Sequence, residues 1–359
     1  MTIRRVLPVM LLLTVVLSAL VRVPTLMAAD VPARLTDQEF WKLVTDLSEP
    51  NGSFRSDNLL SNEVWFQRSL PQLARMTRPG GAYIGVGPEQ NFTYVVALKP
   101  AIAFIVDVRR GNLDLQLMYK ALFELSTDRA DFVSRLFSRR RPATLTAAST
   151  PTQIFNAISA VSPTEDLYVA NLANIRNLLM TTHRFGLSAD DLGGIEYVYR
   201  AFYTMGPEIR YAPFGISGGT IQPTYAELMT AMDDMGIERG FLSSDATFSL
   251  IRDFERRNLL VPIVGNFSGT KAIRAVGRYL KDRNASVSAF YLSNVEEYLL
   301  QDGTWNAFCA NVAALPLDET STFIRSVRTN GPSGLGEGFT SELRPIAAEV
   351  RNCSSSPRP

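Results

Sequence analysis

The sequence predicts an α/β protein with a doubly wound, mainly parallel sheet, helices before the first strand and a helical insertion in the middle of the chain. Strands followed by helices occur near both ends of the chain, around residues 82–109 and 258–295. The strands are continuous apolar runs, as expected where helices cover both faces of a parallel sheet. The segment between them has mostly helical periodicity, so we expect it to cap or interrupt the sheet.

Length and composition exclude several classes of protein. A chain of 359 residues is long enough to bury a large core. It carries 36 Lys and Arg against 35 Asp and Glu, so it has no basic field to hold a nucleic-acid backbone. One histidine and two cysteines cannot supply a Cys/His zinc site or a CxxC redox motif. We therefore expect no nucleic-acid partner and no metal site, although a carboxylate-bound ion is compatible with the sequence.

The N-terminus has the pattern of a secretory signal peptide. Arg4 and Arg5 precede an apolar run over residues 6–21, and the small residues Ala28 and Ala29 follow a short polar bridge. We therefore expect cleavage there and a periplasmic or secreted protein with no stable membrane span. An uncleaved N-terminal membrane anchor is the alternative.

Helices are predicted before the first strand. Thr36 and Glu39 have the spacing of a capping box, and apolar residues recur at helical spacing from there to about Ser48. Turn residues follow at 50–52, and a second helical stretch is predicted to begin within residues 56–63.

The first strand, helix and second strand follow one another closely. Residues 82–84 form a short, apolar, β-prone strand that runs into a glycine-containing turn. Residues 92–98 can form a helix that ends before a proline. Residues 101–108 then read as a buried strand with one acid, Asp107, at its carboxyl end.

The helical insertion is expected over about residues 113–257. It begins with one long or two broken helices over residues 113–137 and includes an aromatic-rich helix over residues 192–205. The βα pattern then returns, with a strand over 259–264, a helix over 270–280, a strand over 286–292, a helix from Val295 and a last strand over 322–327.

These elements divide the chain into a signal peptide (residues 1–29), a single α/β domain (residues 30–330) and a poorly ordered tail (residues 331–359) rich in Gly, Ser and Pro. In an oxidising compartment Cys309 and Cys353 could form a disulfide that ties this tail to the body. Two reduced thiols fit the sequence equally well.

The strongest functional signal is the turn with Gly85 and Gly87, which is followed by Asp107 at the end of the next strand. In such folds the turn lets the backbone approach a nucleotide-like ligand, and the acid accepts hydrogen bonds from ribose hydroxyls. Glu89 stands where a third small residue is usual, and Pro88 removes one N–H donor. A carboxylate there would repel a pyrophosphate, so a ligand with an amino group fits better.

A second group of polar residues comes shortly before the first strand: Asp57, Asn58, Asn62 and Glu63. A segment in that place could close over a ligand bound at the sheet. The alternative is that these residues only cap a helix and contribute surface polarity.

Two asparagines each follow a strand. Asn266 and Asn294 lie where open α/β sheets bind ligands, so we expect at least one of them to face a cleft. The alternative is that they cap the helices that begin at Thr270 and Val295.

The strand–turn–helix units resemble those of the class I S-adenosylmethionine-dependent methyltransferases, which have a Rossmann-like fold. The resemblance rests on Tyr83-Ile84-Gly85-Val86-Gly87, on Phe104-Ile105-Val106-Asp107 and on the later units Val261 to Gly269 and Val287 to Asn294. It implies S-adenosylmethionine as the cofactor, with Gly85 and Gly87 near its methionyl part and Asp107 on its ribose.

The chain is also similar to a group of uncharacterised exported bacterial proteins with a methyltransferase-like sheet. This resemblance rests on Phe40-Trp41-Lys42-Leu43-Val44, Ser56 to Glu63, Asn258-Leu259-Leu260-Val261-Pro262 and Tyr291-Leu292-Ser293-Asn294-Val295-Glu296. It implies export and the fold, but no settled activity.

Two functions follow from this reading. The first is an exported enzyme that binds S-adenosylmethionine or a related nucleoside and transfers a methyl group to an unknown acceptor, mainly by positioning the two reactants. The alternative is a catalytically inactive binding or structural protein on the same fold, which Glu89 and the export signal favour because S-adenosylmethionine is made in the cytoplasm. The sequence assigns no catalytic residue and no oligomeric state.

A serine hydrolase is not favoured. Residues 215–219 match G-x-S-x-G, but the single histidine, His183, precedes Ser217, whereas the α/β-hydrolase order needs a histidine after the nucleophile. We therefore interpret the match as a glycine-rich loop, and we expect His183 to be a surface or capping residue.

Overall fold

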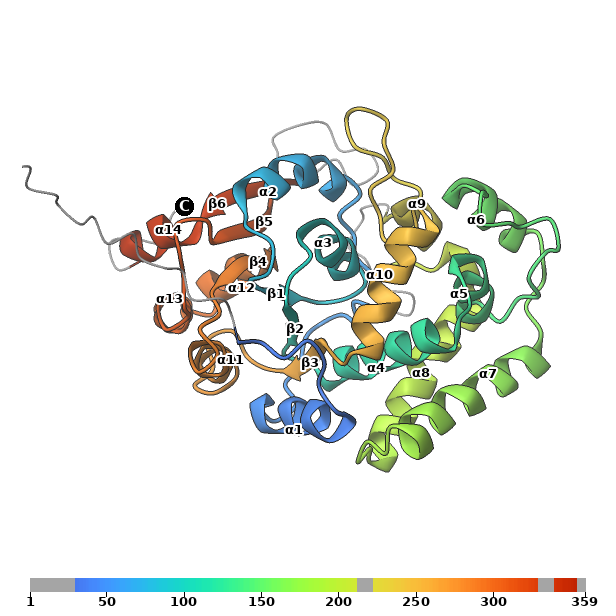
Figure 1. The fold of residues 1–359 in the computed structure, drawn as a ribbon, viewed down its shortest axis with the longest axis horizontal. Coiled ribbons are helices and arrows are strands. Elements are labelled where there is room, and N and C mark those ends of the chain that lie inside the picture. Colours follow the sequence, from blue (N-terminus) through green and yellow to red (C-terminus); the bar gives the residue numbers. More distant parts are fainter. Residues whose placement is uncertain (1–29, 212–221, 329–338, 354–359) are drawn as a thin grey trace, which may run out of the picture.

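The computed structural model describes residues 30–211, 222–328 and 339–353 (Figure 1). These residues form a six-stranded sheet of order β3-β2-β1-β4-β5-β6, in which only β6 is antiparallel to its neighbour. The prediction of an α/β fold with a mainly parallel sheet is therefore confirmed. The strands are β1 (Ala82–Val86), β2 (Ile102–Asp107), β3 (Leu260–Val264), β4 (Val287–Ser293), β5 (Thr322–Arg328) and β6 (Phe339–Pro345).

The strand order reverses at the centre of the sheet. The chain proceeds outward from β1 to β2 and β3, then crosses back to place β4 on the other side of β1. Open α/β sheets bind ligands outside the carboxyl ends of their strands at such a reversal. The carboxyl ends of β1, β2 and β4, which we name the carboxyl edge, are therefore the candidate position for a ligand site.

Helices cover both faces of the sheet. Figure 1 shows α3 (Gln90–Leu98), α4 (Arg110–Leu125) and α10 (Asp245–Arg256) on one face, with α11 (Ala272–Lys281) and α13 (Trp305–Ala313) on the other. All five residues of β3 and all six of β2 are buried, which explains why the sequence reads as unbroken apolar runs.

The predicted helical insertion is present between α4 and β3, and it forms the lobe on the right of Figure 1. Aromatic rings join it to the sheet layer: Phe123 of α4 lies 5.1 Å from Phe92 of α3 and 4.6 Å from Phe132. Its elements are α5 (Arg129–Leu136), α6 (Pro151–Ser159), α7 (Glu165–Asn177), η2 (Leu178–Thr182), α8 (Ala189–Met205), η3 (Gly206–Glu208), α9 (Tyr225–Met229) and then α10.

The first predicted helix is confirmed as α1 (Asp37–Leu47), and its capping box is formed: Thr36 Oγ1 accepts from Glu39 N at 3.2 Å, and Glu39 accepts from Thr36 N at 2.8 Å. The second predicted helical stretch is wrong. Residues 56–63 contain no helix, and helical structure begins only at η1 (Phe66–Ser69) and α2 (Leu70–Met76). The side chains of this segment bond to distant residues instead, as described below.

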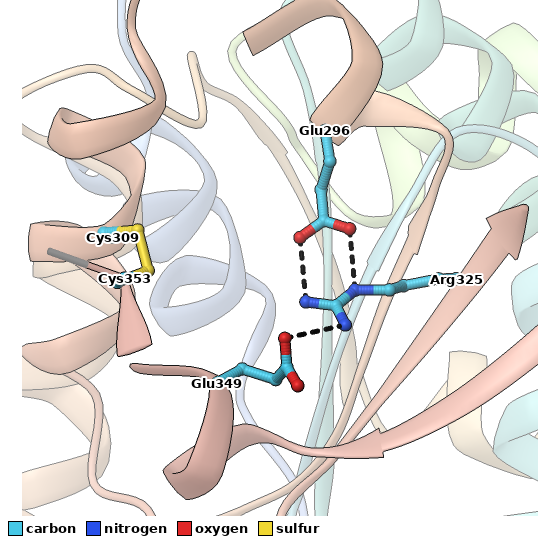
Figure 2. Close-up of a disulfide and its surroundings, with 5 residues drawn as sticks. All are labelled: Glu296, Cys309, Arg325, Glu349 and Cys353. Carbon is cyan, nitrogen blue, oxygen red and sulfur yellow. Dashed lines mark hydrogen bonds and ion pairs between the residues drawn. A yellow bond between two sulfur atoms is a disulfide. The ribbon is translucent and has the colours of Figure 1, made fainter. Parts of the chain in front are cut away.

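The C-terminal region differs from the poorly ordered tail that the sequence predicts, because residues 339–352 form β6 and α14 (Ile346–Asn352). A disulfide between Cys309 and Cys353, with 5.9 Å between the Cα atoms, joins α13 to the end of α14 (Figure 2). Arg325 of β5 lies nearby, 2.6 Å from Glu296 and 3.2 Å from Glu349, and its side chain is 8% exposed. Of the two cysteine states that fit the sequence, the structure has the disulfide.

Two predictions fall on residues outside the described ranges: the signal peptide and the glycine-rich match at 215–219. Within the ranges that are described, no helix is long and apolar enough to cross a membrane.

Candidate functional site

The two glycines of the β1 turn serve different purposes. Gly87 has φ +76°, which favours glycine, and a Cβ atom at this position would meet no atom within 4 Å. A Cβ at Gly85 would instead lie 1.9 Å from Oδ1 of Asn91, which accepts from Tyr83 at 2.8 Å. Packing against α3 therefore explains Gly85, whereas the left-handed backbone explains Gly87, which is buried but has free space beside its Cα at the carboxyl end of β1.

Asp107 lies at the tip of β2, one strand from that turn, as the sequence predicts. Its carboxylate is already bonded to Arg109: Oδ1 accepts from the backbone N at 2.9 Å and from Nε at 3.1 Å, and Oδ2 accepts from Nη2 at 3.0 Å. The two side chains are 6% and 11% exposed. Arg109 also donates through Nη1 to the carbonyl of Asp57. A ribose could take the role predicted for Asp107 only by exchanging with part of this bidentate pair.

Glu89 precedes α3 and is completely buried. Its two carboxylate oxygens accept from Ser61 N at 3.1 and 3.2 Å. Burial raises the pKa of Glu89 to about 7, although the hydrogen bond from Ser61 opposes the rise. The carboxyl predicted to meet an amino group of a ligand therefore bonds to the chain itself.

In the structure Glu63 lies beside Ser293 at the carboxyl end of β4, although the two residues are 230 positions apart in the sequence. Its Oε1 accepts from Ser293 at 2.6 Å and from Tyr291 at 2.9 Å, and its Oε2 accepts from Gln90 at 3.0 Å. Burial raises the pKa of Glu63, although the bonds from Ser293, Gln90 and Tyr291 oppose the rise. All three donors are neutral, so they solvate the carboxylate without a matching charge.

Glu89 and Glu63 together anchor residues 56–63, which we name the strap. Ser61 Oγ also donates to Gln90, so the strap is bonded to the start of α3 as well as to the end of β4. The strap therefore covers the carboxyl edge at β1 and β4. The sequence predicted a segment closing over this edge, and the structure brings Glu63 there in an irregular conformation rather than a helix.

The other three strap residues differ in their surroundings. Asp57 accepts from Tyr197 of α8 at 2.7 Å, so it ties the strap to the insertion. Asn58 has φ +48°, and its Oδ1 is buried with no hydrogen-bond partner among the described residues. Asn62 is only half-buried. Asp57 is thus explained by structure, whereas Asn58 carries an unused acceptor.

The two strand-end asparagines are not brought to one point. Asn266 accepts from Ser268 N at 3.0 Å and shapes the turn after β3, and Asn294 occupies the cap position of α12 (Val295–Gln301) without a side-chain cap bond. Glu49, which the sequence did not single out, caps α11 by accepting from Lys271 N and Ala272 N at 2.9 Å each. It occupies the helix N-terminus that an anionic ligand would use after β3.

The inner side of α4 carries further unused acceptors. Gln116 Nε2 donates to the carbonyl of Gly87 at 3.0 Å, and its Oε1 is buried without a partner among the described residues, as is Oδ1 of Asn112 one turn earlier. Both side chains are at most 2% exposed. Buried acceptors of this kind require a donor, so a ligand with hydroxyl or amino groups would satisfy them.

No group of three or more His, Cys, Asp or Glu side chains is arranged to hold a metal ion in the part of the chain that the structure describes. Arg109 and Gln116 are site residues that the sequence analysis missed. Arg109 directly follows the strand that ends at Asp107 and is therefore the one that chain position could have revealed.

Comparison with known families gives one match. Residues 59–155 and 197–346, more than half of the chain, match a family model described as a domain of unknown function, DUF7790. The match covers all six strands and leaves out α7 and η2 of the insertion. No curated protein matches the chain.

Proposed function

Because the chain belongs to the DUF7790 family, whose description assigns no activity, its function must be argued from the site, and we propose that it binds S-adenosylmethionine or a related nucleoside. The observation that carries this proposal is the left-handed Gly87 turn, with free space beside its Cα, one strand from Asp107 at the reversal of a β3-β2-β1-β4-β5 sheet. We propose further that the bound cofactor donates its methyl group to an acceptor that is still to be identified.

The residues present fit such a ligand in part. The free space at Gly87 would let a ligand approach the backbone of the turn. The side-chain oxygens of Asn112 and Gln116, which have no hydrogen-bond partner within the described ranges, could accept from the amino and hydroxyl groups of the ligand. Asp107 fits only if a ribose hydroxyl replaces one donor of Arg109, and Glu89 fits only if Ser61 releases it. The cofactor would supply the reactive methyl group, and the chain would hold it in place and exclude water.

Export is part of the same proposal. Disulfides persist in oxidising compartments, and the Cys309–Cys353 bond is what an exported protein would keep. The N-terminal pattern of charge, apolar run and small residues points the same way.

A second candidate is a binding or structural protein without catalysis. The specific observation in its favour is that the chain's own groups bond to the carboxylates of the edge: Arg109 to Asp107, Ser61 to Glu89, and Ser293 with Tyr291 to Glu63. In this reading the strap replaces a ligand and the sheet serves only as a scaffold.

Calorimetric titration separates the two candidates. We expect the exported protein, purified from the periplasm and checked by its mass for cleavage near residue 29, to bind S-adenosylmethionine or S-adenosylhomocysteine at micromolar concentration. Asp107→Asn should weaken binding by about 1–3 kcal/mol because a carboxylate acceptor is lost. Asp46→Asn, at an exposed position of α1, is the matched control.

Four outcomes are informative. Binding that Asp107→Asn weakens supports the nucleoside site, and binding that it leaves unchanged removes Asp107 from that site. No heat of binding at millimolar ligand, from a protein with a normal unfolding transition, would favour the second candidate. Recovery of the protein only from the cytoplasm, with an intact N-terminus, contradicts export.

A further inference from the structure

The opposite edge of the sheet holds a compact cluster of charged groups around His183, the single histidine of the chain. Its Nδ1 lies 2.9 Å from Oδ1 of Asp37, at the start of α1, and its Nε2 lies 3.1 Å from Oε2 of Glu124, at the end of α4. The ring is 10% exposed. His183 stands at the C-cap of η2, where its backbone N donates to Leu178 O at 2.9 Å, so the prediction of a capping position is confirmed. Its ring has a further role, because it connects two helices that are far apart in the sequence.

The geometry determines the protonation state that satisfies this site. An ionised carboxylate only accepts hydrogen bonds, and neutral imidazole carries one N–H, so a neutral ring could bond to Asp37 or to Glu124 but not to both. Imidazolium has an N–H on each nitrogen and satisfies both oxygens at once. The protonated ring is therefore the form that satisfies both contacts.

The other charged groups around the ring come from three helices. Lys120 of α4 lies 2.8 Å from Glu124 and 4.0 Å from Glu255 of α10. Lys120 and Glu255 are almost completely buried. Asp37 of α1 also accepts from Asn258 at 2.9 Å. With His183 protonated, two cations face Asp37, Glu124 and Glu255.

The electrostatic balance agrees with this arrangement. Burial lowers the pKa of His183, but the hydrogen bond and the charge of Glu124 raise it more, so the pKa lies above its usual 6.5. Burial raises the pKa of Glu124, but the bonds and charges of His183 and Lys120 prevail and lower it to about 2. Burial raises the pKa of Glu255 to about 8, because the opposing charge of Lys120 is 4.0 Å away and the charge of Glu124 adds to the rise.

Aromatic rings attach α1 at the same place. Phe185 stacks on His183, with ring centroids 5.0 Å apart and planes 8° from parallel, and it stacks on Trp41 of α1 at 5.3 Å. Phe40 of α1 lies 5.1 Å from Phe185 and under the ammonium group of Lys120. The position of α1 therefore depends on residues 183–185 of the insertion and on the end of α4.

We propose that protonated His183 is a pH-sensitive clasp that holds α1 and the helical insertion against α4, and that its deprotonation loosens α1. The raised pKa sets the direction of the effect. The stabilisation is fully present below the unfolded value of 6.5 and is lost as the pH rises through the folded value. The clasp is thus closed below pH 6.5 and opens as the pH rises above that value.

Nitrogen NMR of protein labelled with 15N-histidine tests the first half of the proposal, because the full chain then gives one imidazole signal if the purification tag contains no histidine. We expect both ring nitrogens to show the protonated shift at pH 6.5 and the midpoint to lie above 6.5. Asp37→Asn should lower the midpoint, whereas Asp46→Asn, on the same helix but exposed, should leave it unchanged. A midpoint at or below 6.5, or one deprotonated nitrogen at pH 6.5, would overturn the clasp.

Hydrogen exchange tests the second half. After correction for the intrinsic rate, we expect the protection of α1 to fall between pH 6 and 9, while the protection of α3 is unchanged. His183→Gln should show the low protection of α1 at every pH. If His183→Gln does not fold, the wild-type comparison of α1 with α3 decides alone, and equal protection of α1 at both pH values refutes the release.

Discussion

Two buried clusters, one at the carboxyl ends of the strands and one at the opposite ends, surround glutamate carboxyl groups with different partners. At the carboxyl edge, Glu63 and Glu89 receive hydrogen bonds only from hydroxyl, amide and backbone donors, and their pKa values are raised. At the other edge, Glu124 faces Lys120 and His183, and its pKa is lowered to about 2. Burial alone therefore does not decide whether a carboxyl is ionised, because the charge of its partner can reverse the sign.

This difference separates two kinds of stability. Within the His183 cluster, the charged forms of Glu124 and His183 stabilise each other, so loss of either charge is costly. At the carboxyl edge, ionisation of the buried Glu63 and Glu89 is unfavourable. A ligand with a positive or strongly donating group would stabilise their ionised forms. The carboxyl ends of the strands are therefore the part of the molecule that would gain from such a partner.

The largest effect is expected for Lys120→Met, which retains the length of the side chain and removes the cation. Glu124 and Glu255 would then lie buried near each other with one positive partner fewer. Breaking a buried ionic group in this way costs about 3–5 kcal/mol. Urea unfolding at pH 7 measures the loss.

The control for Lys120→Met is Lys42→Met, which breaks an ion pair of the same spacing on the surface of α1. Its side chains are 71% and 55% exposed, so the change should stay within about 0.5 kcal/mol. Equal effects of the two substitutions would show that the buried cluster contributes no more than a surface pair.

Glu124→Gln should be destabilising by about 3 kcal/mol at pH 7, because a lowered carboxyl pKa contributes stability that is present above the unfolded value of 4.5. That contribution is lost as the pH falls through the folded value of about 2. The difference between wild type and variant should therefore shrink toward zero in acid. Unfolding curves at several pH values between 2 and 7 test this, and a constant difference would contradict it.

Glu89→Gln should act with the opposite sign and a smaller size. A raised carboxyl pKa means that wild-type stability falls as the pH rises from 4.5 to about 7, while the amide still accepts from Ser61 N. The variant should gain about 1–2 kcal/mol at pH 8 and match the wild type near pH 4. Destabilisation at pH 8 would show that Ser61 needs the charged acceptor.

The sheet was predictable because its strands are local and apolar. Residues of β1, β2 and β3 are short hydrophobic runs bounded by turn residues, and the capping box of Thr36 and Glu39 marks the start of α1 within four residues. Gly87 and Asp107 were also accessible, since a turn after one strand and an acid after the next can be identified from spacing.

The strap and His183 were not predictable, because their conformation depends on partners that are distant in the sequence. Glu63 bonds to Ser293, and His183 bonds to Asp37 and Glu124, so local periodicity carries no information about either. The strap does not form the predicted helix, because Ser61 and Glu63 bond to the start of α3 and the end of β4 instead.

Helix α4 connects the two edges physically. It has 16 residues and spans about 24 Å, from its first turn beside Arg109 to Glu124 in its last turn. Suppose a ligand at the Gly87 turn shifted this helix along its axis: the proton affinity of His183 would change with it. By thermodynamic reciprocity the proton would then change the ligand's affinity by the same factor. Proton uptake on ligand binding would thus measure how far binding at the start of α4 affects His183 at its end.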